Sequence, residues 1–113
     1  MCSSDLIFAH PERLPPQRLA LMQAMIARNG PALIAHLEQF TLPPPKAELA
    51  RVKAPTLILW GRADKVIPVA QASELAAAVP GAKLIIYDDV GHAPQEEASA
   101  RSIADVRAFL NDK

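Results

Sequence analysis

The second half of the chain alternates short apolar runs with helical patterns. Residues 56–60 are apolar without alternation, which is typical of a parallel strand covered on both faces, and residues 83–87 form a second such run. Residues 68–79 and 96–111 instead carry apolar side chains at helical spacing. The apolar faces of these two predicted helices comprise Ala72, Leu75, Ala76 and Val79 in one, and Ile103, Val106 and Leu110 in the other. The pattern therefore predicts the order strand, helix, strand, helix.

Proline divides the first half of the chain into short elements. Eight of the 11 prolines fall within the first 55 residues. Residues 16–29 should form a helix that ends at Gly30, because glycine commonly follows a helix end. Pro31 should begin a second helix, whose apolar face comprises Leu33, Leu37 and Phe40. We expect residues 43–45 to form an extended connector and residues 46–55 to contain a short helix that leads into the first strand.

The predicted order of elements brings two polar residues to one place. Strands joined by a helix of this length run parallel, so both end at the same edge of the sheet, where open α/β sheets bind ligands. Asp64 follows the first strand and His92 follows the second. In neighbouring strands, about 4.8 Å apart, these side chains come within hydrogen-bonding reach. Such a pair suits a carboxylate that holds an imidazole in one tautomer and stabilises its charged form.

Other interpretations of these residues remain open at this point. Asp64 lies in a Gly-x-x-Asp turn pattern, where aspartate is favoured for its local backbone hydrogen bonds, and His92 follows a glycine as a loop histidine would. A metal site formed by Asp88, Asp89 and His92 is a further alternative. We favour it least, because hydrolytic metal sites usually draw on more histidine than this stretch offers. The remaining histidines, His10 and His36, suggest no site.

The composition argues against several classes of protein. Twelve basic and 12 acidic side chains in 113 residues give a formal net charge of +0, so no basic field attracts nucleic acid or an anionic membrane. The single Cys2 cannot form an internal disulfide, and no apolar run approaches the roughly 20 residues of a membrane-spanning helix. We therefore expect a soluble, cytoplasmic protein without a nucleic-acid or membrane partner.

The first six residues, MCSSDL, follow no periodic pattern. Their codons could come from a sequencing-adapter end as readily as from a gene, so we treat residues 1–6 as a non-native leader and exclude them from the fold. In that case the chain is the rear portion of a longer protein.

The stretch APTLILWGRADKVIPVAQASELAAAVPGAKLIIYDDVGHAPQEEAS resembles the C-terminal part of the α/β-hydrolase fold, with its W-G-x-x-D-x-x-x-P and G-H-x-P motifs. The resemblance implies that Asp64 is the acid and His92 the base of a catalytic triad. Pro68 then begins the helix after the acid loop, and Glu97 occupies the acidic position that commonly follows the histidine. By this resemblance, residues 46–113 form the C-terminal part of the hydrolase core, two parallel strands with flanking helices. Residues 7–45 resemble the end of the helical cap.

One departure from the family pattern concerns the nucleophile. The family carries it on a G-x-S-x-G elbow before the acid, and none of the four glycines begins such a motif. The serines lie in the leader or on predicted helices, namely Ser3, Ser4, Ser73, Ser99 and Ser102. No HGGG-like oxyanion segment is present either. The acid and base are therefore present, whereas the nucleophile and oxyanion hole are not.

The sequence as a whole predicts a fragment of an α/β-hydrolase. The intact parent would act on a small ester or on a ketone with a cleavable carbon–carbon bond, and the fragment alone would be inactive. Two alternatives are a dehalogenase or epoxide hydrolase with an aspartate nucleophile, and a non-catalytic binding protein of the same fold. No G-x-G-x-x-G motif indicates a dinucleotide, so no cofactor is expected. The expected partner is a small-molecule substrate, and an unpaired apolar strand edge favours self-association of the fragment.

Overall fold

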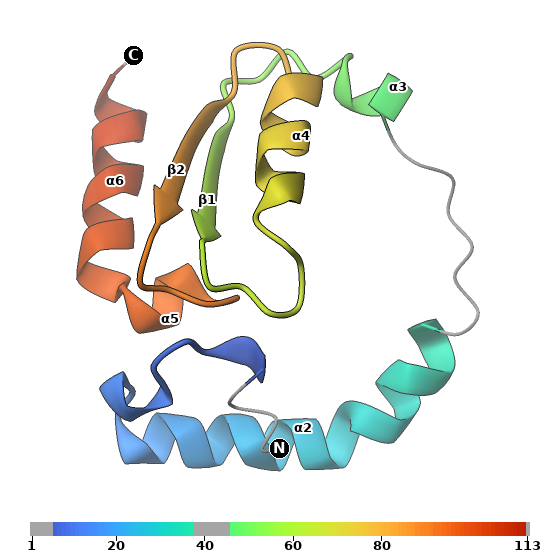
Figure 1. The fold of residues 1–113 in the computed structure, drawn as a ribbon, viewed down its shortest axis with the longest axis vertical. Helices are drawn as coiled ribbons and strands as arrows, with labels where there is room; N and C mark the ends of the chain where they lie inside the picture. The colour runs from blue at the N-terminus through green and yellow to red at the C-terminus, as the bar shows by residue number, and fades with distance from the viewer. Residues whose placement is uncertain (1–5, 38–45, 113) are drawn as a thin grey trace.

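The computed structural model describes residues 6–37 and 46–112 (Figure 1). Its elements in chain order are the 3-10 helix η1 (Pro11–Arg13), α2 (Pro16–Leu37), α3 (Lys46–Leu49), β1 (Leu57–Gly61), α4 (Ala70–Ala78), β2 (Lys83–Tyr87), α5 (Pro94–Glu97) and α6 (Ser99–Asn111). None of the helices in these two ranges is long and apolar enough to cross a membrane.

The two strands form a parallel sheet, with Leu57 opposite Lys83 and Gly61 opposite Tyr87. Helix α4 makes the connection from β1 to β2 that parallel strands require. In Figure 1 the strands lie between α4 and α6, and both strands point toward α5. The predicted order of strand, helix, strand and helix is therefore confirmed, together with the parallel pairing.

Element boundaries in the second half differ slightly from the sequence prediction. The first strand begins and ends one residue later than predicted, and α4 begins at Ala70 rather than at residue 68. The predicted helix over residues 96–111 is wrong in one respect, because Ala98 divides it into α5 and α6. Ala98 has φ −129° and ψ 43°, outside the helical region, and it packs in the core against Tyr87 and Val90.

The predicted helix end at Gly30 is also wrong. Helix α2 continues from Pro16 through Gly30 and Pro31 to Leu37, and Figure 1 shows it bending along its length. Proline cannot donate the hydrogen bond to the carbonyl four residues back, but its fixed φ is compatible with a helix. Pro31 therefore costs α2 a hydrogen bond without ending it. The predictions for Phe40, for the connector at 43–45 and for residues 1–5 lie outside the described residues, as does the side chain of His36.

Two apolar clusters organise the described core. The first contains Tyr87, Val90 and Ala98, with Leu59 and Ile85 packed against it. The second joins Phe8, Leu14 and Ala93, with Ile7, Leu19 and Met22 packed against it. We call residues 6–14 the N-terminal strap, because they pack across the loop that follows β2. The backbone N–H of His92 donates to the carbonyl of Ile7 over 2.7 Å.

The two apolar helix faces predicted in the second half differ in burial. Ala72 of α4 and Val79, the residue directly after this helix, are buried. The α6 face is exposed in the described structure, with fractional exposures of 52% for Ile103, 37% for Val106 and 57% for Leu110. Helix α6 therefore presents an apolar surface that the described residues do not cover.

Candidate active site

Two loops extend beyond the C-terminal ends of the strands. Residues 62–69 join β1 to α4, and residues 88–93 join β2 to α5. The backbone N–H of Arg62 donates to the carbonyl of Tyr87 over 2.8 Å, and that of Ala63 donates to the carbonyl of Val90 over 3.0 Å. The loops are therefore held side by side, at the edge where open α/β sheets bind ligands.

Gly61 allows the loops to approach this closely. A Cβ at this buried position would lie well inside van der Waals contact of the carbonyl oxygens of Val90 and Gly91. Both opposing atoms belong to the backbone, so a side chain at residue 61 would have to displace the loop that carries His92. No local pattern in the sequence indicates this requirement, because it arises from the approach of a segment about 30 positions away.

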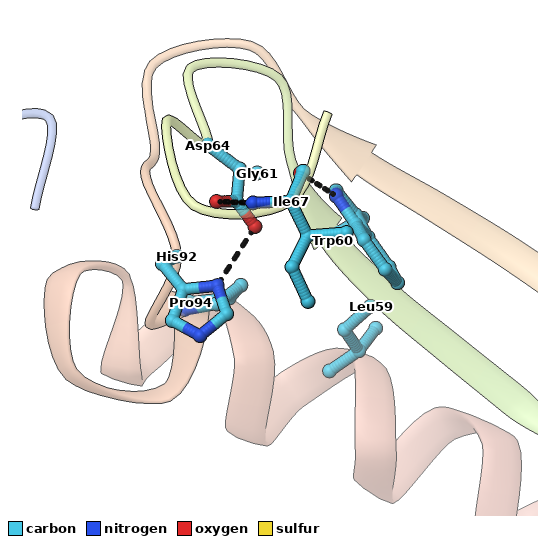
Figure 2. A pocket seen from close by; sticks show the side chains of 7 residues that line it. All are labelled: Leu59, Trp60, Gly61, Asp64, Ile67, His92 and Pro94. Atoms are coloured by element: carbon cyan, nitrogen blue, oxygen red, sulfur yellow. Dashed lines mark hydrogen bonds and ion pairs between the residues drawn. The ribbon is translucent and has the colours of Figure 1, made fainter. Parts of the chain in front are cut away.

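Asp64 and His92 meet between these loops (Figure 2). The ring Nδ1 of His92 lies 2.9 Å from Oδ2 of Asp64. The other carboxylate oxygen, Oδ1, accepts hydrogen bonds from the backbone N–H groups of Val66 at 2.8 Å and Ile67 at 2.9 Å. The geometric prediction is confirmed, since the two side chains touch at the C-terminal edge of adjacent parallel strands. The turn interpretation of Asp64 also holds, because Oδ1 closes the turn while Oδ2 faces the histidine.

The surroundings of Asp64 favour its charged form. Its side chain is only 4% exposed, and this burial raises the pKa of the carboxyl group. The hydrogen bonds from Ile67, His92 and Val66 outweigh the burial, so the pKa of Asp64 lies below its ordinary value. An ionised carboxylate only accepts hydrogen bonds, which assigns the proton in the contact to Nδ1 of His92. Nε2 is then left as the basic nitrogen, and it points away from Asp64 in Figure 2.

A cavity of about 210 Å³ adjoins this pair. The residues that line it, apart from Asp64 and His92, are Leu59, Trp60, Gly61, Ile67 and Pro94. The indole N–H of Trp60 donates to the carbonyl of Ile67 over 3.3 Å, which leaves the ring to form part of the wall. The His92 side chain is 37% exposed, so the imidazole can be reached by a reacting group. The Asp64–His92 pair therefore borders a small, mainly apolar space.

The acidic residues before His92 pair with arginines. Asp88 accepts a hydrogen bond from Arg62. Asp89 accepts one hydrogen bond from Arg13 and one from Arg101, both with a length of 2.8 Å. The alternative metal site would need both carboxylates to turn toward His92. Within residues 6–37 and 46–112, no group of three or more His, Cys, Asp or Glu side chains is arranged to hold a metal ion.

Glu97 makes a larger contribution to this region than the sequence indicated. Its side chain is buried, and its oxygens accept hydrogen bonds from the backbone N–H groups of Gly91, Ala9 and His10. The resemblance placed an acidic residue at this position but gave it no contact. The signal that could have identified the contact is weak, because the strap that supplies two donors lies nearly 90 positions earlier.

No serine or cysteine lines the cavity within the part of the chain that the structure describes. Ser73 lies on α4, and Ser99 and Ser102 lie on α6, where the Ser102 hydroxyl donates to the carbonyl of Ser99. The remaining candidates, Cys2, Ser3 and Ser4, fall outside the described residues. The structure thus brings together the predicted acid and base without adding a nucleophile to them.

The chain is similar to proteins of known activity. It is 38% identical over 66 residues to 2-hydroxy-6-oxononadienedioate/2-hydroxy-6-oxononatrienedioate hydrolase 2 of Pseudomonas putida, which covers 58% of this chain and 22% of that protein. It is 34% identical over 61 residues to Lipase 1 of Psychrobacter immobilis, which covers 54% of this chain and 19% of that protein. The chain spans about a fifth of the length of each of these relatives.

The fold is shared with solved structures. An N-acyl homoserine lactone degrading enzyme superimposes with a TM-score of 0.69 and 31% identity, over 92% of this chain and 43% of that one. Residues 8–99 also match a family described as the alpha/beta hydrolase fold, a range that includes both strands, Asp64 and His92. The chain therefore belongs to the alpha/beta hydrolase fold family.

Proposed function

We propose that this chain supplies the acid and the base of a hydrolase triad, and that the nucleophile comes from a protein segment outside these 113 residues. The observation that carries the proposal is the 2.9 Å contact between Asp64 and Nδ1 of His92, beside an apolar cavity. The contact fixes one tautomer of the imidazole, and that tautomer leaves Nε2 free to accept a proton.

The chemistry follows from the protonation states of this pair. Nε2 of His92 takes the proton of the nucleophile's hydroxyl as its oxygen bonds to a carbonyl carbon, and Asp64 stabilises the resulting imidazolium. The imidazolium then returns the proton to the leaving group, and an acyl-enzyme remains. In the second half of the cycle His92 takes a proton from water, whose oxygen attacks the acyl group. Transfer of that proton back to the nucleophile releases the acid and regenerates the enzyme.

The substrate class that fits is a small ester, or a ketone cleaved between two carbons. The apolar wall formed by Leu59, Trp60 and Ile67 suits an apolar group next to the reacting carbonyl. Similarity to a lipase and to a hydrolase of 2-hydroxy-6-oxononadienedioate supports both choices. These relatives favour attack at a carbonyl over the dehalogenase and epoxide hydrolase alternatives, in which an aspartate attacks a saturated carbon.

The test compares variants in a longer protein that joins an upstream segment with a G-x-S-x-G elbow to this sequence. Asp64→Asn should preserve folding but favour the wrong tautomer of His92, and turnover of a p-nitrophenyl ester should fall by up to about 10⁴-fold. His92→Ala should reduce turnover at least as much. His10→Ala is the matched control, because its imidazole contacts Glu12 at the surface, and it should retain turnover.

The 113-residue chain alone should not hydrolyse the ester, because a histidine and its aspartate offer only weak general-base assistance to water. If the chain alone hydrolyses the ester and His92→Ala abolishes that turnover, the 113-residue chain itself contains a nucleophile. Near-normal turnover by Asp64→Asn or His92→Ala in the longer protein would reject the proposed roles of these two residues.

A further inference from the structure

Glu97 is a buried carboxylate whose contacts are made to the backbone. Its side chain belongs to α5, and the residue is 8% exposed. Oε1 accepts a hydrogen bond from the N–H of Gly91 at 2.8 Å. Oε2 accepts hydrogen bonds from Ala9 at 2.9 Å and His10 at 3.0 Å. Burying a carboxylate is costly unless hydrogen bonds compensate for the lost water, and these three donors provide that compensation.

The three donors come from two segments that meet at His92. Gly91 directly precedes His92, and Ala9 and His10 belong to the N-terminal strap. The strap also binds directly to residues 88–93, the loop that carries His92, which we call the base loop. The N–H of His92 donates a hydrogen bond of 2.7 Å to the carbonyl of Ile7. Glu97 and Ile7 therefore fix the N–H groups of Gly91 and His92 from two sides.

The space around Gly91 shows how tightly this arrangement is packed. A Cβ at Gly91 would lie 2.6 Å from the nitrogen of Ala9, 2.7 Å from the carbonyl oxygen of Ile7 and 2.8 Å from Oε1 of Glu97. Backbone atoms supply two of these three contacts, so a side chain at residue 91 would fit only if the loop and the strap moved apart, which would break their hydrogen bonds. The backbone of the residue that carries the imidazole is thus held between the strap and α5.

We propose that Glu97 is a positioning residue that holds the main chain of His92 so that Nδ1 stays in contact with Asp64. The effect on catalysis rests on the proposed role of His92 as the base, but the effect on the Asp64–His92 contact does not. Glu97 acts through Gly91 and does not touch the cavity, whose lining residues do not include it. The role requires that both carboxylate oxygens accept hydrogen bonds, Oε1 from the base loop and Oε2 from the strap.

This requirement makes Glu97→Gln a sharp test. A glutamine has nearly the same shape, but its NH₂ group would face either the Gly91 N–H or the two strap N–H groups, donor against donor. One side of the arrangement must then separate. Glu96→Gln is the matched control, because Glu96 is the neighbouring residue and binds Arg18 at the start of α2 without contacting Gly91. Glu96→Gln also weakens a contact with the N-terminal region, the Glu96–Arg18 pair, but it leaves the Glu97–Gly91 hydrogen bond intact.

The experiment records the imidazole ¹⁵N and proton signals of His92 in the 113-residue chain. The wild-type chain and Glu96→Gln should show a hydrogen-bonded Nδ1–H signal from His92. Glu97→Gln should lose that signal while the amide signals of β1 and β2 stay in place. Retention of the signal in folded Glu97→Gln, or its equal loss in both variants, would overturn the proposal.

A second variant covers the case in which Glu97→Gln fails to fold. Glu97→Asp keeps the charge but sets the carboxylate back by one methylene, so it should weaken the Nδ1–H signal and speed amide exchange at Gly91. An unchanged signal with unchanged exchange would reject the role of Glu97.

In the longer protein, Glu97→Gln should lower kcat by about 10²-fold with little change in KM, as a small misplacement of a reacting group does. Full activity of His92→Ala would instead reject the proposed function and leave the spectroscopic result intact.

Discussion

At the scale of single residues, two glycines set the distance between the loop that carries Asp64 and the loop that carries His92. Gly61 faces the carbonyl oxygens of Val90 and Gly91, and Gly91 faces the strap and Glu97. Neither glycine has a positive φ, so both are required by packing rather than by backbone conformation. The contact between Asp64 and His92 therefore depends on the absence of two β-carbons as well as on the two polar side chains.

Gly61→Ala should destabilise the chain and separate Asp64 from His92. The added methyl group meets backbone atoms that cannot rotate away, and overpacking of this kind typically costs about 1–3 kcal/mol. Urea unfolding followed by circular dichroism gives the change in the free energy of unfolding, and the His92 Nδ1–H signal reports the contact.

Gly30→Ala is the control for this prediction. A Cβ at Gly30 meets nothing within 4 Å, and Gly30 lies inside α2, where alanine is favoured over glycine by about 1 kcal/mol. This variant should be as stable as the wild-type chain or more stable. If Gly61→Ala unfolds at the wild-type urea concentration, the packing argument is wrong.

At the scale of elements, the sequence predicted the parts that local patterns determine. The apolar runs of β1 and β2 and the spacing of α4 gave the parallel pair, and the pair placed Asp64 next to His92. Gly30 and Pro31 locally indicate the end of one helix and the start of another, but α2 continues through both residues. The contacts of Glu97 and the fit of Gly61 were beyond prediction, because both depend on how distant segments approach one another.

Asp89, in the loop after β2, links that loop to η1 and α6 and should make their association sensitive to acid. Hydrogen bonds from Arg101 of α6 and Arg13 of η1 lower the pKa of Asp89 to about 2, from an ordinary value of 3.8. A folded-state pKa below the unfolded value means that the pairs add stability above about pH 3.8. That contribution should disappear as the pH falls toward 2.

The carboxyl-carbon NMR signal of Asp89 measures this titration directly. The pKa should rise toward 3.8 in Arg101→Gln, because that variant removes the largest cause of the shift. Arg51→Gln serves as the control, because Arg51 follows α3 and pairs with Glu48 of that helix. This variant should leave the Asp89 titration unchanged. A midpoint near 3.8 in the wild-type chain would show that the two arginines do not hold the carboxylate in solution.

At the scale of the whole molecule, the described surface is incomplete on one side. Within residues 6–37 and 46–112, β1 pairs with β2 alone, so its other edge presents unpaired backbone groups. An apolar groove of about 330 Å³ is lined by Leu59 of β1 together with Gln95, Ser102, Ile103, Val106 and Arg107. A two-stranded sheet is marginal by itself, and an open apolar edge is a template for association.

The 113-residue chain should therefore associate with itself as its concentration rises, and its thermal unfolding should be broad and weakly cooperative. Sedimentation velocity over a range of concentrations measures the association.

The double variant Ile103→Lys and Val106→Lys places two like charges on the exposed α6 face. It should therefore associate only at a concentration about tenfold higher or more, which is equivalent to about 1.4 kcal/mol. The double variant Leu21→Lys and Met25→Lys is the matched control, because both residues are exposed but lie on α2, away from the groove. A monomer that melts sharply at every concentration would show that the chain completes its own sheet. Equal effects of the two double variants would show that net charge, and not the α6 face, controls the association.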